Sequence, residues 1–101
     1  MPSSRYIDLT LGASGSTYTA PANGWFMLNK VSGISNGQSY IVLVNRKTNI
    51  KSQTVVYNYS SSILSAYLPI QKGDVVEILY NSTGEVKEFR FIFAEGSHII
   101  Q

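Results

Sequence analysis

The sequence has 101 residues, of which 44% are hydrophobic and 14% are charged, and this length is enough for one compact domain and too short for two. The net charge of +2 comes from interspersed acids and bases, which excludes the basic tract of a nucleic-acid-binding surface. There is no cysteine for a disulfide or a thiolate metal site, and no apolar run approaches the roughly 18 residues of a membrane span. We therefore expect a single domain over residues 1–101, with frayed ends at 1–5 and 97–101.

The first half of the chain contains four strand patterns. Apolar residues alternate with polar ones, or β-branched and aromatic residues cluster, over 6–11, 17–19, 24–31 and 40–44. Two Asn-Gly pairs, Asn23-Gly24 and Asn36-Gly37, favour the left-handed backbone angles of tight turns. No helical pattern interrupts this series.

The second half continues with strand patterns over 51–59, 64–70, 75–80 and 89–93. We expect Gly73 to take an unusual dihedral angle in the turn at 72–74, and residues 81–85 to form a hairpin loop. Phe89, Phe91 and Phe93 form a stripe that should face the core. About eight short strands separated by turns predict an all-β fold, an antiparallel β-sandwich or jelly roll.

Two of these strands are apolar on both faces, although a sandwich strand normally shows one face to water. They contain "WFML" at 25–28 and "YIVLV" at 40–44. The simplest cover for the second face is another copy of the chain, because exposed apolar patches usually mark interfaces and closed homo-oligomers are common. The alternative is a loop or the N-terminal segment of the same chain. The predicted interface residues are Trp25, Met27, Tyr40, Val42 and Val44.

Three segments together resemble the C-terminal head domains of bacteriophage and prophage tail fibres. They are "RYIDLTLGASGSTYTAPANGWF" at 5–26, "LSAYLPIQKGDVVEILY" at 64–80 and "FRFIFAEGS" at 89–97. The family motifs that they match, in this order, are an extended "YTAP.(N/D)G" entry, an "LP(V/I).KGD.V" turn and a closing "F.F..AEG" strand. The resemblance covers the chain from Arg5 to Ser97.

This resemblance implies a homotrimeric β-sandwich knob, similar in shape to tumour necrosis factor-like and complement-type heads. Such a knob attaches a virion or a phage-tail-like particle to a bacterial surface. The implied partners are other copies of the chain and a bacterial surface glycan or another envelope component. The implied location is the virion tail fibre, or the cytoplasm of a prophage host before assembly.

The family patterns do not extend over residues 45–62, so candidate ligand-binding residues there are chosen from their chemistry. Tyr57, Asn58 and Tyr59 could stack on a sugar ring and hydrogen-bond its hydroxyls, or the two tyrosines could be ordinary strand aromatics. Arg46 and Lys47, with Lys51 nearby, form the one local excess of positive charge and could meet phosphate or acidic sugars. A solvated turn that protects a sheet edge is the alternative.

We expect that the protein is not an enzyme and that it has no catalytic residue, no bound metal and no cofactor. His98 is the single histidine and lies near the C-terminus, and the six carboxylates mostly alternate outward along strands. Two alternatives to the receptor-binding head remain. One is a structural trimerisation cap of a fibre that binds no ligand, and the other is a small glycan hydrolase.

Overall fold

The computed structural model describes residues 2–33, 37–57 and 62–94, and within them the chain forms eight β-strands and no helix. Asn36, Asn58, Tyr59 and residues 97–101, for which the sequence carried expectations, lie outside the described residues. The strands are β1 (Pro2–Asp8), β2 (Ser16–Thr19), β3 (Gly24–Val31), β4 (Gln38–Asn45), β5 (Lys51–Tyr57), β6 (Ile63–Ile70), β7 (Val75–Tyr80) and β8 (Val86–Ala94).

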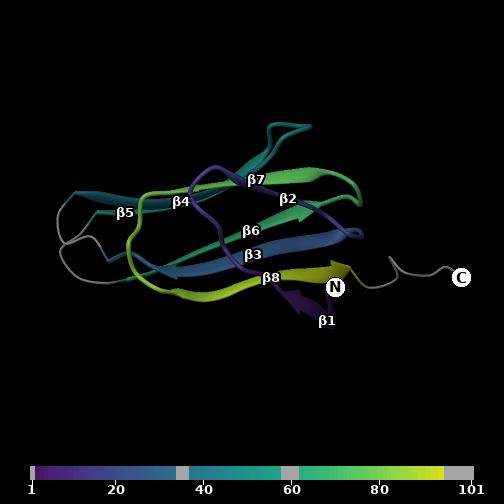
Figure 1. Ribbon diagram of the computed structural model, residues 1–101, viewed down its shortest axis with the longest axis horizontal. Helices are drawn as coiled ribbons and strands as arrows, with labels where there is room; N and C mark the ends of the chain where they lie inside the picture. The colour runs from purple at the N-terminus through teal and green to yellow at the C-terminus, as the bar shows by residue number, and fades with distance from the viewer. Residues whose placement is uncertain (1, 34–36, 58–61, 95–101) are drawn as a thin grey trace, which may run out of the picture.

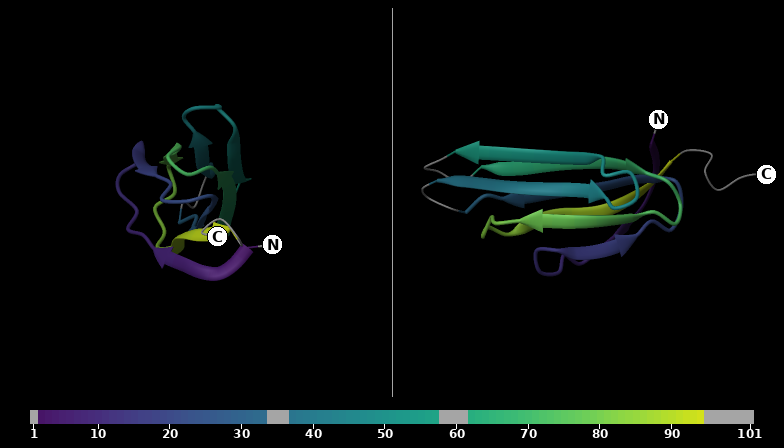
Figure 2. Two further views of the ribbon diagram at one scale, coloured as in Figure 1. Left: turned by 90° about the vertical axis from the view of Figure 1, so that its right-hand side faces the viewer. Right: turned by 90° about the horizontal axis from the view of Figure 1, so that it is seen from above.

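The strands form two four-stranded antiparallel sheets that lie face to face (Figures 1 and 2). The first sheet has the order β1-β8-β3-β6, and the second sheet has the order β2-β7-β4-β5. Successive strands from β1 to β4 alternate between the sheets, and β5 to β8 return alongside them. This order is that of a jelly roll, so the predicted fold class is confirmed.

The core lies between the two sheets and is supplied by alternate residues of each strand. From the first sheet come Phe26, Leu28, Leu68 and Phe91, and the ring of Phe26 meets that of Phe91 edge-on at 5.1 Å. Ile41, Leu43, Val76 and Ile78 come from the second sheet. The predicted inward stripe of phenylalanines on β8 is present, with Phe89 and Phe91 buried and Phe93 packed against the core.

The connection at 81–85 differs from the predicted hairpin loop. It joins β7 of the second sheet to β8 of the first sheet, and these two strands do not pair with each other. Gly84 lies so close to Val31 that an added Cβ would stand 2.6 Å from the Val31 Cβ. A hairpin and a crossover between sheets use the same turn residues, so the local sequence could not distinguish them.

The first strand also differs from its prediction over residues 6–11. Residues 2–5, expected to fray, begin β1, which pairs with β8, and regular pairing ends at Asp8. The chain then leaves the first sheet for the second, which ends the ladder. Leu9 and Leu11 lie beyond the strand but still pack against the core. Their apolar character therefore reflects burial in the connection rather than the alternation of a strand.

Gly24 is required for a different reason from the one predicted. Positive φ angles occur at Gly73 (88°), as predicted, and at Gly37 (86°), but not at Gly24 or Asn23. Gly24 instead lies against β8, where an added Cβ would collide with the carbonyl oxygen of Ile92 and stand 2.7 Å from Cζ of Phe91. Close approach of two strands, rather than a left-handed turn, excludes a side chain there.

Candidate functional site

A depression of about 510 Å³ lies at the end of the sandwich where β3 begins and β4, β6 and β8 end. It is the strongest candidate for a binding site in the described part of the chain, and we call it the end groove. Its lining residues are Asn23, Gly24, Trp25, Asn45, Lys47, Thr48, Ile50, Pro69, Ile70, Gln71, Asp74 and Ala94.

The turn between β4 and β5 forms one wall of the end groove, and Asn45 determines its shape. The side-chain oxygen of Asn45 accepts hydrogen bonds from the backbone N–H groups of Lys47 (2.8 Å) and Thr48 (3.3 Å). Asn49 closes the turn with a φ of 63°, and its N–H donates to the Asn45 carbonyl oxygen. Because Asn45 is itself buried, this Asx-type turn is anchored in the body of the protein.

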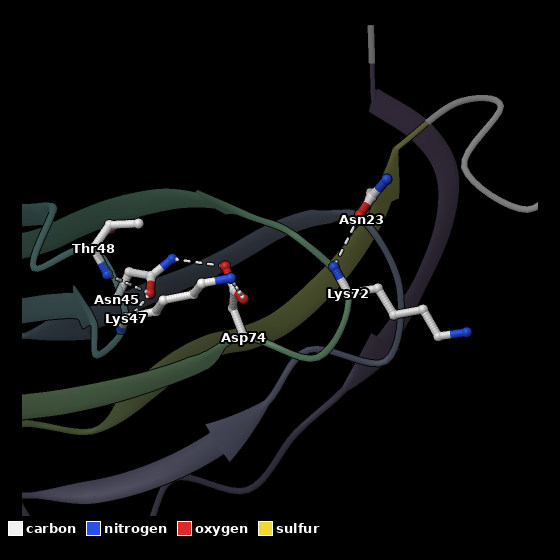
Figure 3. A network of polar contacts seen from close by, with 6 residues as sticks. All are labelled: Asn23, Asn45, Lys47, Thr48, Lys72 and Asp74. Atoms are coloured by element: carbon white, nitrogen blue, oxygen red, sulfur yellow. Dashed lines mark hydrogen bonds and ion pairs between the residues drawn. The ribbon is translucent and has the colours of Figure 1, made fainter.

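Asp74 joins this wall to the turn between β6 and β7 (Figure 3). The amide nitrogen of Asn45 donates to Asp74 Oδ2 at 3.2 Å. Lys47 Nζ stands 3.9 Å from Asp74 Oδ1, too far for a direct hydrogen bond. The Asp74 side chain is 12% exposed and the Lys47 side chain is 73% exposed, so the carboxylate lies inside the groove and the ammonium at its rim.

The rest of the lining combines an apolar surface with amide groups. Trp25, Ile50, Pro69 and Ile70 supply the apolar part, and Asn23 and Gln71 add polar side chains. The Asn23 side-chain oxygen accepts a hydrogen bond from the backbone N–H of Lys72 at 2.8 Å. An apolar surface beside a few placed polar groups is the usual composition of a small-molecule site.

The structure separates the predicted ligand-binding residues. Lys47 lines the end groove, whereas Arg46 is absent from its lining and pairs with Glu77 at 3.4 Å. Tyr57 lies at the opposite end of the β4–β5 hairpin, opposite Gln38, whose side-chain amide donates to its hydroxyl at 2.9 Å. Tyr57 is 74% exposed and Asn58 and Tyr59 are outside the described residues, so these tyrosines and the basic pair do not form one described site.

The predicted interface residues occupy the outer faces of both sheets. Trp25 and Met27 are on the outer face of the first sheet, because Phe26 and Leu28 point into the core. Tyr40, Val42 and Val44 are on the outer face of the second sheet.

Two of these five residues are already buried within the single chain, so they do not need the second copy that was predicted to cover them. Met27 and Val44 are each only 6% exposed. The cross-strand neighbours of Met27 are Tyr67 and Arg90. Long side chains opposite one another on a sheet face can cover a neighbour without another layer.

The outer face of the first sheet still presents apolar groups to solvent. One cross-strand row contains Pro69, Trp25, Ile92 and Tyr6, and Tyr67 lies in the next row. Tyr6 and Tyr67 are about half exposed. The guanidinium of Arg90 lies 4.2 Å from the centre of the Tyr6 ring, and its Nε donates to Asp8 at 2.9 Å. This hydrogen bond raises the pKa of Arg90, which is charged in any case.

A second polar centre lies at the other end of β3. Lys30 is buried, and its ammonium donates to the carbonyl oxygens of Ser82 and Gly84, both at 2.8 Å. Its Nζ also lies 4.8 Å from the centre of the Tyr80 ring. Burial lowers the pKa of Lys30. This lysine holds the 81–85 connection against the first sheet.

Sequence reasoning missed Asn45 and Asp74, the two residues that organise the end groove. Asp74 was recognised only as part of a turn, and Asn45 only as the start of a segment without a family pattern. An Asn followed by a short turn with a second Asn at 49 is a usable signal for an Asx turn. Nothing local indicates that Asp74, 29 residues later, would meet it.

Within residues 2–33, 37–57 and 62–94 there is no group of three histidine, cysteine, aspartate or glutamate side chains placed to hold a metal ion. The same residues contain no helix that could cross a membrane. No protein-family model, curated protein or solved structure shows significant similarity to the chain.

Proposed function

We propose that this chain is the receptor-binding head of a phage or phage-tail-like fibre, that it assembles as a homotrimer, and that it binds a glycan on a bacterial surface. The order of the three sequence motifs supports the family. The observation that carries the binding role is the end groove, where Trp25, Lys47, Asn45 and Asp74 converge from separate turns and strand ends. A jelly roll supports such a site because its rigid sheets hold the loops at its ends in place.

Assembly is supported by the two outer faces. Each protomer has apolar residues on both, with Tyr6 and Tyr67 on the first sheet and Tyr40 and Val42 on the second. A contact that joins two different faces is heterologous, and it closes into a ring when the rotation between subunits allows. Because Met27 and Val44 are already covered, we assign the subunit contacts to their more exposed neighbours.

The assembly is tested by measuring the mass of the purified protein in solution by light scattering. We expect three times the chain mass. Val55 lies opposite Tyr40 on the outer face of the second sheet and is exposed. Tyr67→Lys and Val55→Lys each place a charge on one outer face, and each should give monomers if the two faces meet. Thr10→Lys, at an exposed position outside both sheets, is the matched control and should leave the trimer intact. A wild-type protein that stays monomeric at high concentration contradicts the assembly.

The binding role is tested by adsorption of the purified protein to envelope preparations from a panel of bacteria. We expect saturable binding to at least one envelope, and its loss when the surface glycan is removed. A trimer that adsorbs to none of them favours the second candidate, a structural cap that holds a fibre together. The apolar outer faces specifically support that candidate, because they would serve assembly without any ligand.

A further inference from the structure

Two charged groups in the wall of the end groove restrict the chemical class of ligand that it can bind. Lys47 Nζ and Asp74 Oδ1 are 3.9 Å apart, which brings opposite charges together without a direct hydrogen bond. Asp74 Oδ2 accepts a hydrogen bond from the Asn45 amide at 3.2 Å. Asp74 Oδ1 has only the 3.9 Å contact with Lys47 among the described residues. Within the part of the chain that the structure describes, the wall therefore presents a donor and an acceptor side by side, both with hydrogen-bonding capacity left.

A hydroxyl group fits between these two atoms. Its oxygen can accept from an ammonium and its hydrogen can be donated to a carboxylate, each at about 2.8 Å, and a single oxygen can satisfy both distances across this gap. A carboxylate or phosphate oxygen cannot do the same at neutral pH. It would be attracted to Lys47 but repelled by Asp74, which is the more enclosed of the two.

The positive charge near the end groove does not reverse this preference. Arg46 pairs with Glu77 and does not line the groove. The side chain of Lys72 extends away from Lys47 and Asp74 (Figure 3). Among the described residues, Lys47 is thus the one cation in the lining, and Asp74 balances it.

We propose that the end groove binds a neutral sugar ring, one hydroxyl of which is held between Lys47 Nζ and Asp74 Oδ1. Trp25, Ile50 and Pro69 supply the apolar surface for the C–H face of the ring, and Asn23 and Gln71 lie within the same lining for further hydroxyls. This inference rests on the proposed function. It replaces the acidic ligand suggested by Arg46 and Lys47 in the sequence with an uncharged one.

The test uses immobilised glucose, galactose, mannose and N-acetylglucosamine, with glucuronate, galacturonate and glucose 6-phosphate as the acidic probes. We expect the wild-type protein to be retained by at least one neutral probe, and at least tenfold more weakly by each of the three acidic probes. Asp74→Asn and Lys47→Met should each weaken the neutral binding at least tenfold. Lys72→Met removes the same charge from the same end of the molecule and should change binding less than twofold.

Three results would overturn the inference. They are no retention on any neutral probe, stronger retention on an acidic probe, or equal losses in Lys47→Met and Lys72→Met, which would indicate general charge attraction. Adsorption to bacterial envelopes is a separate measurement, and it tests the proposed function. If wild type, Asp74→Asn and Lys47→Met all adsorb equally, the protein is a receptor-binding head whose site lies outside the end groove.

Discussion

The two ends of the sandwich each contain a lysine within reach of acceptor groups, but they use it differently. At one end Lys30 is buried and its ammonium holds two backbone carbonyls at 2.8 Å. At the other end Lys47 is exposed and stands 3.9 Å from a carboxylate that has capacity to spare. The ammonium of Lys30 uses its hydrogen bonds to hold the 81–85 connection in place. The ammonium of Lys47 and its neighbouring carboxylate keep hydrogen-bonding capacity that a ligand could use.

The two lysines differ because one ammonium group loses its hydrating water on folding and the other keeps it. Lys30 is buried near the end of β3, so its ammonium loses water and must be compensated by acceptors inside the protein. Lys47 lies in a turn and keeps its water, so no tight partner is needed. Burial therefore distinguishes a lysine that serves the fold from one that is free to serve binding, although the two look alike in sequence.

The largest expected effect is the difference in stability between two single variants, Lys30→Met and Lys47→Met. Lys30→Met leaves the carbonyl groups of Ser82 and Gly84 without their donor and should lower the free energy of unfolding by about 2 kcal/mol. Lys47→Met removes an exposed charge and should change it by less than about 0.5 kcal/mol. Urea denaturation of both variants measures the difference. Equal losses would show that the two ends do not differ in the way described.

A somewhat smaller effect is expected at Asn45, which fixes the wall of the end groove. Asn45→Ala removes the acceptor for two backbone N–H groups and should cost about 1.5 kcal/mol, because the residue is buried. Asn23→Ala, at an exposed position with one such bond, is the control and should cost about 0.5 kcal/mol. The same urea experiment applies, and a greater loss in Asn23→Ala than in Asn45→Ala would contradict this view of the turn.

A third test uses pH to examine the Lys30 end. Because burial lowers the pKa of Lys30 below 10.5, the folded state binds its proton less tightly than the unfolded state. The contribution of Lys30 to stability should therefore rise with pH between the lowered pKa and about 10.5. It is measured as the difference between wild type and Lys30→Met at several alkaline pH values. A difference that falls as pH rises would mean that the ammonium form is favoured by folding.

The smallest effect is expected for Arg46, which lies beside the end groove without lining it. Its ion pair with Glu77 is largely exposed, so Arg46→Met should reduce stability by about 0.5 kcal/mol or less. Adsorption to envelopes should stay within twofold of wild type. A loss of adsorption as large as that of Lys47→Met would place Arg46 in the site and would shift the ligand toward an anion.

Much of the fold could be predicted because alternation reports burial directly. The stripe of Phe89, Phe91 and Phe93 follows from it. The strands 24–31 and 75–80 follow instead from clusters of apolar, β-branched and aromatic residues between turns, and the structure contains both strands with these bounds. Alternation says nothing about which strand lies next to which. For that reason the 81–85 connection was taken for a hairpin although it crosses between the sheets.

The site could be predicted only in part, because its residues are brought together by the packing of distant segments. Lys47 was chosen for its chemistry as a cation, and the end groove includes it; Trp25, which also lines the groove, was predicted as an interface residue instead. Tyr57 was chosen by the same reasoning but lies at the other end of its hairpin. A β-strand of seven residues spans roughly 20 Å, so neighbours in a short segment of sequence can belong to opposite ends of the molecule.

The sequence by itself determined the all-β class, the approximate strands and the inward-facing residues, because side-chain period and turn chemistry act over a few residues. The tertiary structure alone decided that Asn45 and Asp74 meet and that Gly24 lies against β8. It also decided that Met27 is covered by its own chain and that Lys30 and Lys47 have opposite surroundings. Each of these depends on which segments pack together, and that is set by the whole core rather than by any local pattern.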